Sequence, residues 1–186
     1  MVDRAKIAEA VRQIIDAIGE DPQREGLAET PRRVADMYGE LFSGLWRDPL
    51  EVLRGGFRDE NDEVVILRDI PFYSLCEHHF LPFYGVAHVG YIPNGRLVGI
   101  SKIARALDIL ARRPQVQERL TRQLADCILE ALDADGVAVV LEAEHLCLSM
   151  RGAHKPGTRV ATSTVRGTFR KGTFPRSELL AAVQGK

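Results

Sequence analysis

The sequence has little cysteine, no long apolar run and no surplus of one charge, and each absence limits what the protein can be. Three cysteines among 186 residues are a small, odd number, which argues against a disulfide framework. Lys and Arg number 25 against 26 Asp and Glu, so a general nucleic-acid-coating surface is not expected. The apolar runs are too short to cross a membrane, and the first residues lack the pattern of a signal peptide. We therefore expect a cytoplasmic protein with no membrane or nucleic-acid partner.

The N-terminal third of the chain is predicted to be helical. Apolar residues recur at helical spacing over residues 3–18, and Thr30–Pro31 has the pattern of an N-cap followed by a first-turn proline. Residues 48–62 are loop-like, with glycines and an acidic stretch. The sequence therefore divides into an N-terminal helical extension, residues 1–62, and a second domain, residues 63–186.

The second domain begins where β-branched and aromatic runs appear. Strands are expected over 63–70, 83–92, 96–100, 137–150 and 159–169, and helices over 101–110, 115–132 and 175–183. A tight turn at Pro93–Asn94–Gly95 joins two of the strands, which favours antiparallel pairing. The predicted class is α+β: a small antiparallel sheet with two helices on one face. The N-terminal helices or another subunit would cover the other face.

The densest cluster of reactive side chains is Cys76–Glu77–His78–His79. Cys76 and His79 are three residues apart, so one turn can present a sulfur and a nitrogen to one metal ion. His145 and Cys147 are two apart on one expected strand and would point to the same face. Cys76, His79 and Cys147 would then form a Cys2His site with an open position, which is typical of catalytic rather than structural zinc. His78 and His145 would remain beside it as proton carriers.

A structural interpretation of these residues stays open on spacing alone. Cys147 would then be a small core residue in a strand, and the histidines would be surface groups. Cys127 lies on the apolar face of an expected helix, and we assign it to core packing.

A second group of candidate residues is basic. Ser101, Lys102 and Arg105 lie at one expected helix start, where free amides, a lysine and an arginine favour phosphate. Arg151 follows Cys147 closely and would join them if the strands are adjacent. The alternative for such a Lys/Arg pair is a solvated helix face.

A third candidate is the pair Gln117–Glu118. A carboxylate there can accept two hydrogen bonds from an N–H/NH2 pair such as the edge of guanine. The alternative is a helix-start glutamate that interacts with the helix dipole.

Four long motifs, in order and at consistent spacing, make the sequence resemble the GTP cyclohydrolase I family. They are Ser74–His79, Gly99–Arg105, Arg113–Leu120, and His145–Cys147 with Met150–Gly152. The resemblance extends over nearly the whole chain, from Asp21–Leu27 and Thr30–Arg33 to Arg166–Gly167.

The resemblance implies a tunnelling fold, in which four-stranded antiparallel sheets with two helices each assemble side by side into a β-barrel. Residues 63–186 would be the tunnelling-fold catalytic domain. Two pentameric rings would stack into a toroidal homodecamer, with active sites shared between neighbouring subunits. The implied reaction converts GTP to 7,8-dihydroneopterin triphosphate and formate, at the entry to folate or tetrahydropterin biosynthesis.

The resemblance also implies roles for the metal-site and catalytic residues. Cys76, His79 and Cys147 would bind Zn2+, which promotes the addition of water at C8 of the purine and the opening of its imidazole ring. His78 would be the leading acid/base and His145 the second proton carrier.

The remaining implied roles concern the substrate. Ser101 would contact the ribose or triphosphate end during the later rearrangement and ring closure. Lys102, Arg105 and Arg151 would hold the triphosphate, with Arg33 from another subunit. Glu118 and Gln117 would read the guanine edge.

Two other functions remain in view at this point. A 7-cyano-7-deazaguanine reductase would share the fold but needs NADPH and a thioimidate-forming cysteine, a role open to Cys76. A zinc protein that binds nucleotides without catalysis is the non-enzyme alternative. Two histidines beside the ligand set argue against it, because a structural site needs no spare proton carriers.

Overall fold

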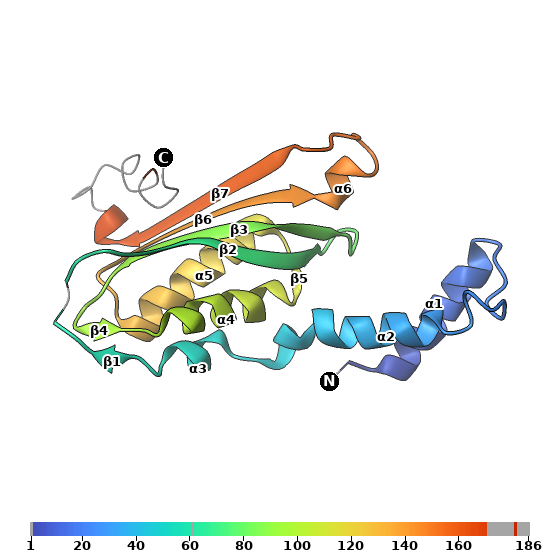
Figure 1. Cartoon of the computed structure of the whole chain (residues 1–186), viewed down its shortest axis with the longest axis horizontal. Coiled ribbons are helices and arrows are strands. Elements are labelled where there is room, and N and C mark those ends of the chain that lie inside the picture. Colours follow the sequence, from blue (N-terminus) through green and yellow to red (C-terminus); the bar gives the residue numbers. More distant parts are fainter. Residues whose placement is uncertain (1, 61, 171–180, 182–186) are drawn as a thin grey trace.

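A central antiparallel sheet organises the molecule (Figure 1). The computed structural model describes residues 2–60, 62–170 and 181. The sheet order is β5-β2-β3-β6-β7. Its strands are β2 (Val65–Cys76), β3 (Pro82–Ile92), β6 (Gly136–His145), β7 (Arg159–Gly167) and the short β5 (Pro114–Gln115). The four long strands pair in antiparallel fashion, whereas β5 pairs with the end of β2 in parallel. The predicted α+β class and the four-stranded antiparallel sheet are therefore confirmed.

Two helices, α4 (Ile100–Ala111) and α5 (Gln117–Leu132), cover one face of this sheet. Strand β6 shows why they pack there, because Val137, Val139 and Leu141 alternate along it and are fully buried against the helices. Each such side chain stabilises the fold by about 1.5–3 kcal/mol when it leaves water. This two-layer core has the predicted arrangement of one antiparallel sheet with two helices on one face.

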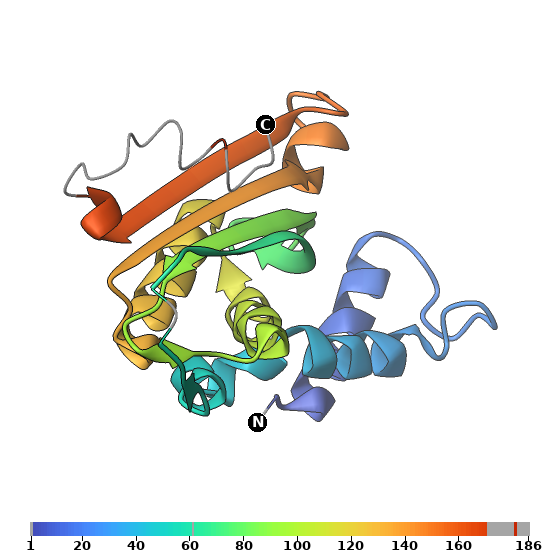
Figure 2. The ribbon, with the colours of Figure 1, turned by 60° about the vertical axis from the view of Figure 1, so that its left-hand side comes forward.

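The N-terminal helices lie beside the sheet rather than across it. Helices α1 (Arg4–Ala17) and α2 (Thr30–Leu41) pack on each other and project to one side in both views (Figures 1 and 2). On the sheet face opposite α4 and α5, Ala138 and Val140 pack with Phe169.

Residues 48–62 are not the loop that the sequence predicted. Asp48 caps a short helix, α3 (Pro49–Leu53), by accepting a hydrogen bond from the backbone of Leu50, and Leu53 is fully buried in the main core. Strand β1 (Phe57–Arg58) then pairs with β4 (Arg96–Leu97). The segment is too short for a periodic pattern, so its packing against α4 and α5 could not be recognised in the sequence. The domain boundary at residue 62 stays a prediction.

Two predicted helix starts are wrong by one residue. Glu29, not Thr30, is the N-cap of α2, and it makes no side-chain capping bond. Helix α4 begins at Ile100, one residue before the predicted start at Ser101, and its N-cap is Gly99. In both cases the polar residue, Thr30 or Ser101, lies within the first helical turn and not before it. It therefore did not mark the start of the helix.

The strand predicted over 137–150 ends early. Its pairing with β3 stops at Phe83 opposite His145, and the chain then turns into the one-turn helix α6 (Leu146–Ser149). His145 and Cys147 therefore do not share a strand face as predicted. The strand predicted over 63–70 is longer instead and continues to Cys76. Of the helix predicted over 175–183, only Ala181 is among the described residues, and it is helical; the rest of that prediction lies outside them. Within those residues, no helix combines the length and apolar character that crossing a membrane requires.

Candidate functional site

A tight turn at the end of β2 positions the first two candidate metal ligands. The backbone N–H groups of His79 and Phe80 both donate to the carbonyl of Cys76, at 3.3 and 2.8 Å. Cys76 itself donates to Leu81, at 2.9 Å, so the turn closes between β2 and β3. Phe80 has a φ of 52°, a left-handed conformation that an aromatic residue rarely adopts. The turn therefore has a defined shape, with buried Cys76 and exposed His79 on the same side.

Cys147 completes the group from α6. The ligand atoms of Cys76, His79 and Cys147 all lie within 4.8 Å of one another. The structure brings the predicted set together, but by another path, because one turn of helix, not the alternation of a strand, places Cys147 beside Cys76 and His79. The role of the three residues as metal ligands stays a prediction. Burial and the neighbouring Cys76 raise the pKa of the Cys147 thiol, while Arg151 acts in the opposite direction.

The donor set fits zinc. Two sulfurs and one imidazole nitrogen are ligands that Zn2+ prefers, and three protein ligands leave a coordination position for water or substrate. Within the described part of the chain, no other group of three His, Cys, Asp or Glu side chains meets the same distance criterion.

Both predicted proton carriers lie beside this cluster. The Nδ1 atom of His78 is 3.8 Å from the Sγ atom of Cys76, and its ring meets that of His79 edge-on at 6.3 Å between centroids. The ring of His145 stacks on Phe83, with 4.7 Å between centroids and 4° between planes. Burial lowers the pKa of His145, and the Glu118 carboxylate opposes that shift.

Gln117 is not presented to solvent. Its side chain is buried at 1% exposure, and its amide NH2 donates to the carbonyls of Leu141 and Val160, at 3.0 and 2.9 Å. Its carbonyl oxygen lies 2.8 Å from the Nε2 atom of His145. The predicted contact between Gln117 and a guanine edge would have to replace these bonds, and it stays a prediction.

An ion pair that the sequence did not single out braces the turn of residues 76–81, the metal turn. Arg119 binds both carboxylate oxygens of Glu77, with 3.0 Å from one guanidinium nitrogen to Oε1. This pairing lowers the pKa of Glu77. Glu77 stands inside the Cys–Glu–His–His motif, which was the available indication, whereas Arg119 resembles any exposed helix arginine in the sequence. The pair ties the start of α5 to the turn that carries His78 and His79.

The structure separates the other candidate substrate residues into two places. Glu118, in the first turn of α5, and Arg151, just after α6, lie at the metal-site end of the sheet. Ser101 and Lys102 lie at the opposite end of α4, beside β4 (Figure 1). The C-terminal end of α4 touches β2 next to the metal turn, where the Ser74 hydroxyl donates to the carbonyl of Ala111 at 2.7 Å. At 1.5 Å per residue, Ser101 is therefore about 15 Å away along the helix axis.

Lys102, Arg105 and Arg33 do not reach the metal cluster within one chain. Lys102 donates to the carbonyl of Gly55 at 2.7 Å. Arg105 lines a cavity of about 190 Å3, together with Ser43, Gly44, Arg47, Asp108, Ile109 and Arg112. Arg33 is exposed on α2.

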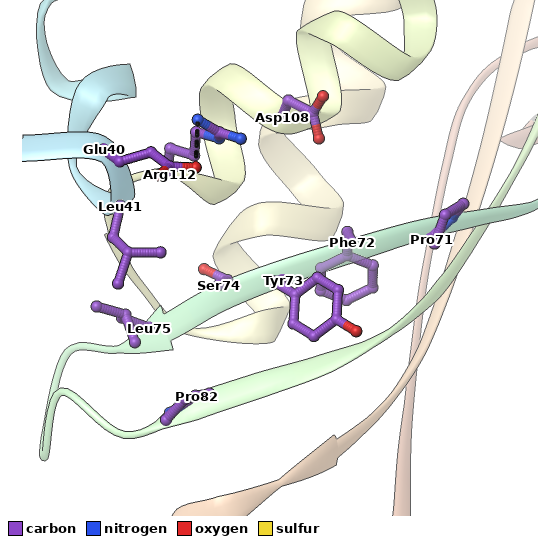
Figure 3. Close-up of a pocket in the computed structure, with 10 residues that line it drawn as sticks. All are labelled: Glu40, Leu41, Pro71, Phe72, Tyr73, Ser74, Leu75, Pro82, Asp108 and Arg112. Atoms are coloured by element: carbon purple, nitrogen blue, oxygen red, sulfur yellow. Dashed lines mark ion pairs between the residues drawn. The ribbon is translucent and has the colours of Figure 1, made fainter. Parts of the chain in front are cut away.

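A larger cavity of about 350 Å3 lies elsewhere, along the outer edge of β2 (Figure 3). Its lining residues are Glu40, Leu41, Pro71, Phe72, Tyr73, Ser74, Leu75, Pro82, Asp108 and Arg112. Glu40 and Arg112 approach to 3.8 Å across it. None of the three candidate ligands lines this cavity, so size alone does not mark the place where the chemistry is expected.

The fold and the site together define a class: an α+β protein whose sheet ends at two cysteines and a histidine that could hold a metal ion, with two further histidines nearby. The family model for GTP cyclohydrolase I matches residues 7–184. The chain belongs to the GTP cyclohydrolase I family, and it is an enzyme of that family.

Relatives of similar length support this assignment. The chain is 60% identical over 188 residues to a GTP cyclohydrolase 1 from Dehalococcoides mccartyi, covering 100% of both chains. It is 56% identical over 187 residues to that of Caldanaerobacter subterraneus, again covering 100% of both. It is 53% identical to that of Bacillus cytotoxicus over 186 residues, which are 100% of this chain and 98% of the relative. Among solved structures, an archaeosine synthase QueF-Like protein in the apo form matches with a TM-score of 0.45 and 21% identity, over 56% of this chain and 93% of that one.

Proposed function

We propose that this chain converts GTP and water to 7,8-dihydroneopterin triphosphate and formate, with zinc as its cofactor. The observation that carries the proposal is the cluster of Cys76, His79 and Cys147 within 4.8 Å, with His78 and His145 beside it, in a chain of this family. A structural zinc site would need neither the open position nor the flanking histidines.

Cys76, His79 and Cys147 would hold the zinc ion. Bound zinc supplies a Lewis acid that lowers the pKa of water and so provides a nucleophile for an electrophilic carbon, here C8 of the purine. The remaining chemistry is proton transfer, for which the chain offers His78 and His145.

His78 is the leading candidate to protonate the purine ring nitrogen as the imidazole ring opens. Its Nδ1 atom lies 3.8 Å from Cys76 Sγ, so the ring is adjacent to any substrate atom that reaches the metal site. His145 is the second proton carrier, positioned from the other side of the site by its stacking on Phe83. Release of formate by the second hydrolysis uses the same two groups.

The substrate would be held at both ends. Glu118 is exposed in the first turn of α5, close to His145, and its carboxylate suits the N–H/NH2 edge of guanine. Arg151, beside Cys147, suits the triphosphate. Remote phosphate contacts of this kind orient C8 at the metal site and reduce the entropy lost in the reaction.

The other phosphate residues would come from a neighbouring copy. Ser101, Lys102 and Arg105 lie toward the N-terminal part of α4, about 15 Å or less from the end that touches the metal turn, and Arg33 lies on α2. A second chain placed beside the sheet can bring its own α4 to this metal site. We therefore propose a homo-oligomer, a decamer of two pentamers in which sheets assemble into a barrel, acting in the cytoplasm.

The decisive experiment follows formate and pterin together. Purified protein is incubated with GTP, with and without a chelator, and pterin is read by absorbance and by fluorescence after oxidation. Chelator-sensitive formate with a pterin is the expected result. Formate without a pterin would mean ring opening without closure and would direct attention to Ser101 and the phosphate residues. The absence of both products from zinc-replete, assembled protein would overturn the proposal.

A further inference from the structure

We propose that Gln117 is a positioning residue that holds the His145 ring with a hydrogen on Nε2, so that Nδ1 is the ring nitrogen left for the substrate. The inference deepens the proposed function and rests on it for the role of His145. It stands on hydrogen-bond geometry alone, and it replaces contact with guanine as the task of the Gln117 side chain.

The orientation of the Gln117 amide is determined by its partners. Its Nε2 atom lies 3.0 Å from the carbonyl oxygen of Leu141 and 2.9 Å from that of Val160. Carbonyl oxygens only accept hydrogen bonds, so the atom that faces both of them must be the NH2 group. The Thr162 hydroxyl, at 3.1 Å, is compatible with the same orientation. An exchange of the amide oxygen and nitrogen would bring three oxygen atoms together in a buried place.

The tautomer of His145 follows from that orientation. The Gln117 oxygen, which accepts but cannot donate, lies 2.8 Å from Nε2 of His145. Nε2 must therefore carry a hydrogen in the neutral ring, and it carries one in the protonated ring as well. Stacking on Phe83, with only 4° between the ring planes, holds the imidazole in that orientation. Nδ1 is then the ring nitrogen that a substrate atom can approach.

Glu118, the residue after Gln117, stays available for substrate recognition. Gln117 and Glu118 are consecutive in the first turn of α5, and consecutive helical side chains point about 100° apart. Gln117 is turned inward to β6 and β7, while Glu118 is exposed. One turn of helix thus serves two tasks, with Glu118 available for the purine and Gln117 committed to His145.

The test that does not need turnover is nitrogen NMR of the zinc-loaded protein labelled at histidine. The His145 signals are identified by their absence in His145→Ala. In the unchanged protein we expect a protonated Nε2, and in Gln117→Met we expect a mixture of tautomers. An Nδ1-protonated ring in the unchanged protein, or the same Nε2–H signal in Gln117→Met, would overturn the inference even if the chain is active. Because this readout needs no reaction, it separates failure of the inference from failure of the proposed function.

The kinetic test compares the effect of Gln117→Met in the unchanged protein with its effect in His145→Ala. Gln117→Met should lower kcat by about tenfold or more while KM for GTP changes by less than about twofold, because acid–base catalysis depends on the correct tautomer. Added to His145→Ala, the same change should cost nothing further, since Gln117 acts through His145. A rise in KM that persists in the double variant would instead assign Gln117 to guanine and overturn the inference.

Thr162→Val is the matched control for loss of buried polarity. It removes one partner of the Gln117 amide and one of Thr121 but leaves the oxygen that faces His145. We expect kcat within about twofold and an unchanged His145 signal. Zinc content and melting temperature of each variant show whether it is folded. If Gln117→Met does not fold, Gln117→Asn, which shortens the side chain but keeps the amide, should shift the His145 signal in the same sense.

Discussion

The two ends of helix α4 differ in how firmly the side chains beside them are held. At its C-terminal end, the metal turn, α6 and the start of α5 are joined by buried hydrogen bonds, ring stacking and the Glu77–Arg119 pair. At its N-terminal end, Ser101 is exposed and Lys102 donates to the backbone carbonyl of Gly55 in the loop after α3. The first end therefore holds its candidate residues together within one chain, whereas the second offers charge that a ligand or another chain can use.

The two parts of the proposed reaction therefore require different precision in the placement of their side chains. Metal binding and proton transfer require atoms within a few ångströms of one another, which only a closed and cross-braced turn supplies. Triphosphate binding requires charge at about the correct distance, and flexible Lys and Arg side chains suffice for it. Each end can be altered without the other, and the resulting changes in activity should differ in kind.

The largest effect is expected when the metal end is broken at α6. Cys147→Ser should abolish both zinc binding and turnover, because two ligands on one short turn do not hold zinc in a defined geometry. Zinc content by elemental analysis and formate release measure the two losses. Full activity without bound metal would show that the ligand assignment is wrong.

Cys127→Ser is the matched control for that variant. Burial raises the pKa of the Cys127 thiol to about 11, so it stays protonated and unreactive at neutral pH, and it packs against the main core. Zinc content and rate should both be retained in this variant.

The next largest effect is expected at His78. His78→Ala should keep zinc and GTP binding and lower the rate of ring opening by about 10²–10⁴, the usual range for a general acid or base. Single-turnover formation of the ring-opened product is the measurement. An unchanged rate would remove His78 from the mechanism.

A smaller effect, of a different kind, is expected at the other end of α4. Lys102→Ala or Arg105→Ala should weaken GTP by about tenfold and guanosine hardly at all, since a charged hydrogen bond contributes about 1.5–3 kcal/mol. Binding of both ligands to zinc-loaded protein measures the difference. Equal losses for GTP and guanosine would contradict the phosphate assignment.

Mixing the two kinds of variant tests whether one site uses residues from two chains. If a site takes its metal from one chain and Lys102 from the next, co-assembled Cys147→Ser and Lys102→Ala chains contain some complete sites. With GTP far below KM, sites that lack Lys102 should keep about a tenth of the normal activity. Random mixing in equal amounts should then give about a quarter of the normal activity per site, because half of the sites keep Cys147 and half of those receive Lys102. Activity of only about a twentieth after verified co-assembly would mean that both ends act within one chain.

The smallest effect is expected from Arg119→Lys. Lysine keeps the positive charge but cannot bind both oxygens of Glu77, so the metal turn is less well braced. We expect zinc affinity and kcat to fall by about two- to fivefold, with binding of guanosine unchanged. Zinc titration against a competing chelator measures the change, and an identical zinc affinity would show that the pair does not support the turn.

Much of this molecule was predictable from local pattern. The helices α1, α4 and α5 appear where apolar residues recur at helical spacing, and the long strands appear where β-branched runs begin. The candidate ligands Cys76 and His79 were recognisable because they are three positions apart in one turn. Helix α3 escaped prediction because five residues carry no measurable period.

Cys147 lies beside Cys76 and His79 as predicted, but the backbone reaches that place by another path. The sequence placed it on a strand, where alternation would align it with His145, but pairing of β6 with β3 ends at His145. The following turn of α6 brings the sulfur to the same cluster. A strand or a turn of helix can place the same side chain at the same point. The predicted grouping of residues therefore does not establish the backbone conformation that produces it.

Residue type and short spacing were enough to predict the α+β class and to single out Cys76, His79 and Cys147 as candidate ligands. The folded structure was needed to show that Gln117 faces His145, that Arg119 pairs with Glu77, and that Lys102 binds Gly55 at the far end of α4. The physical reason is that such contacts join segments 28 to 47 positions apart in the chain, and their distances depend on how the sheet and its helices pack.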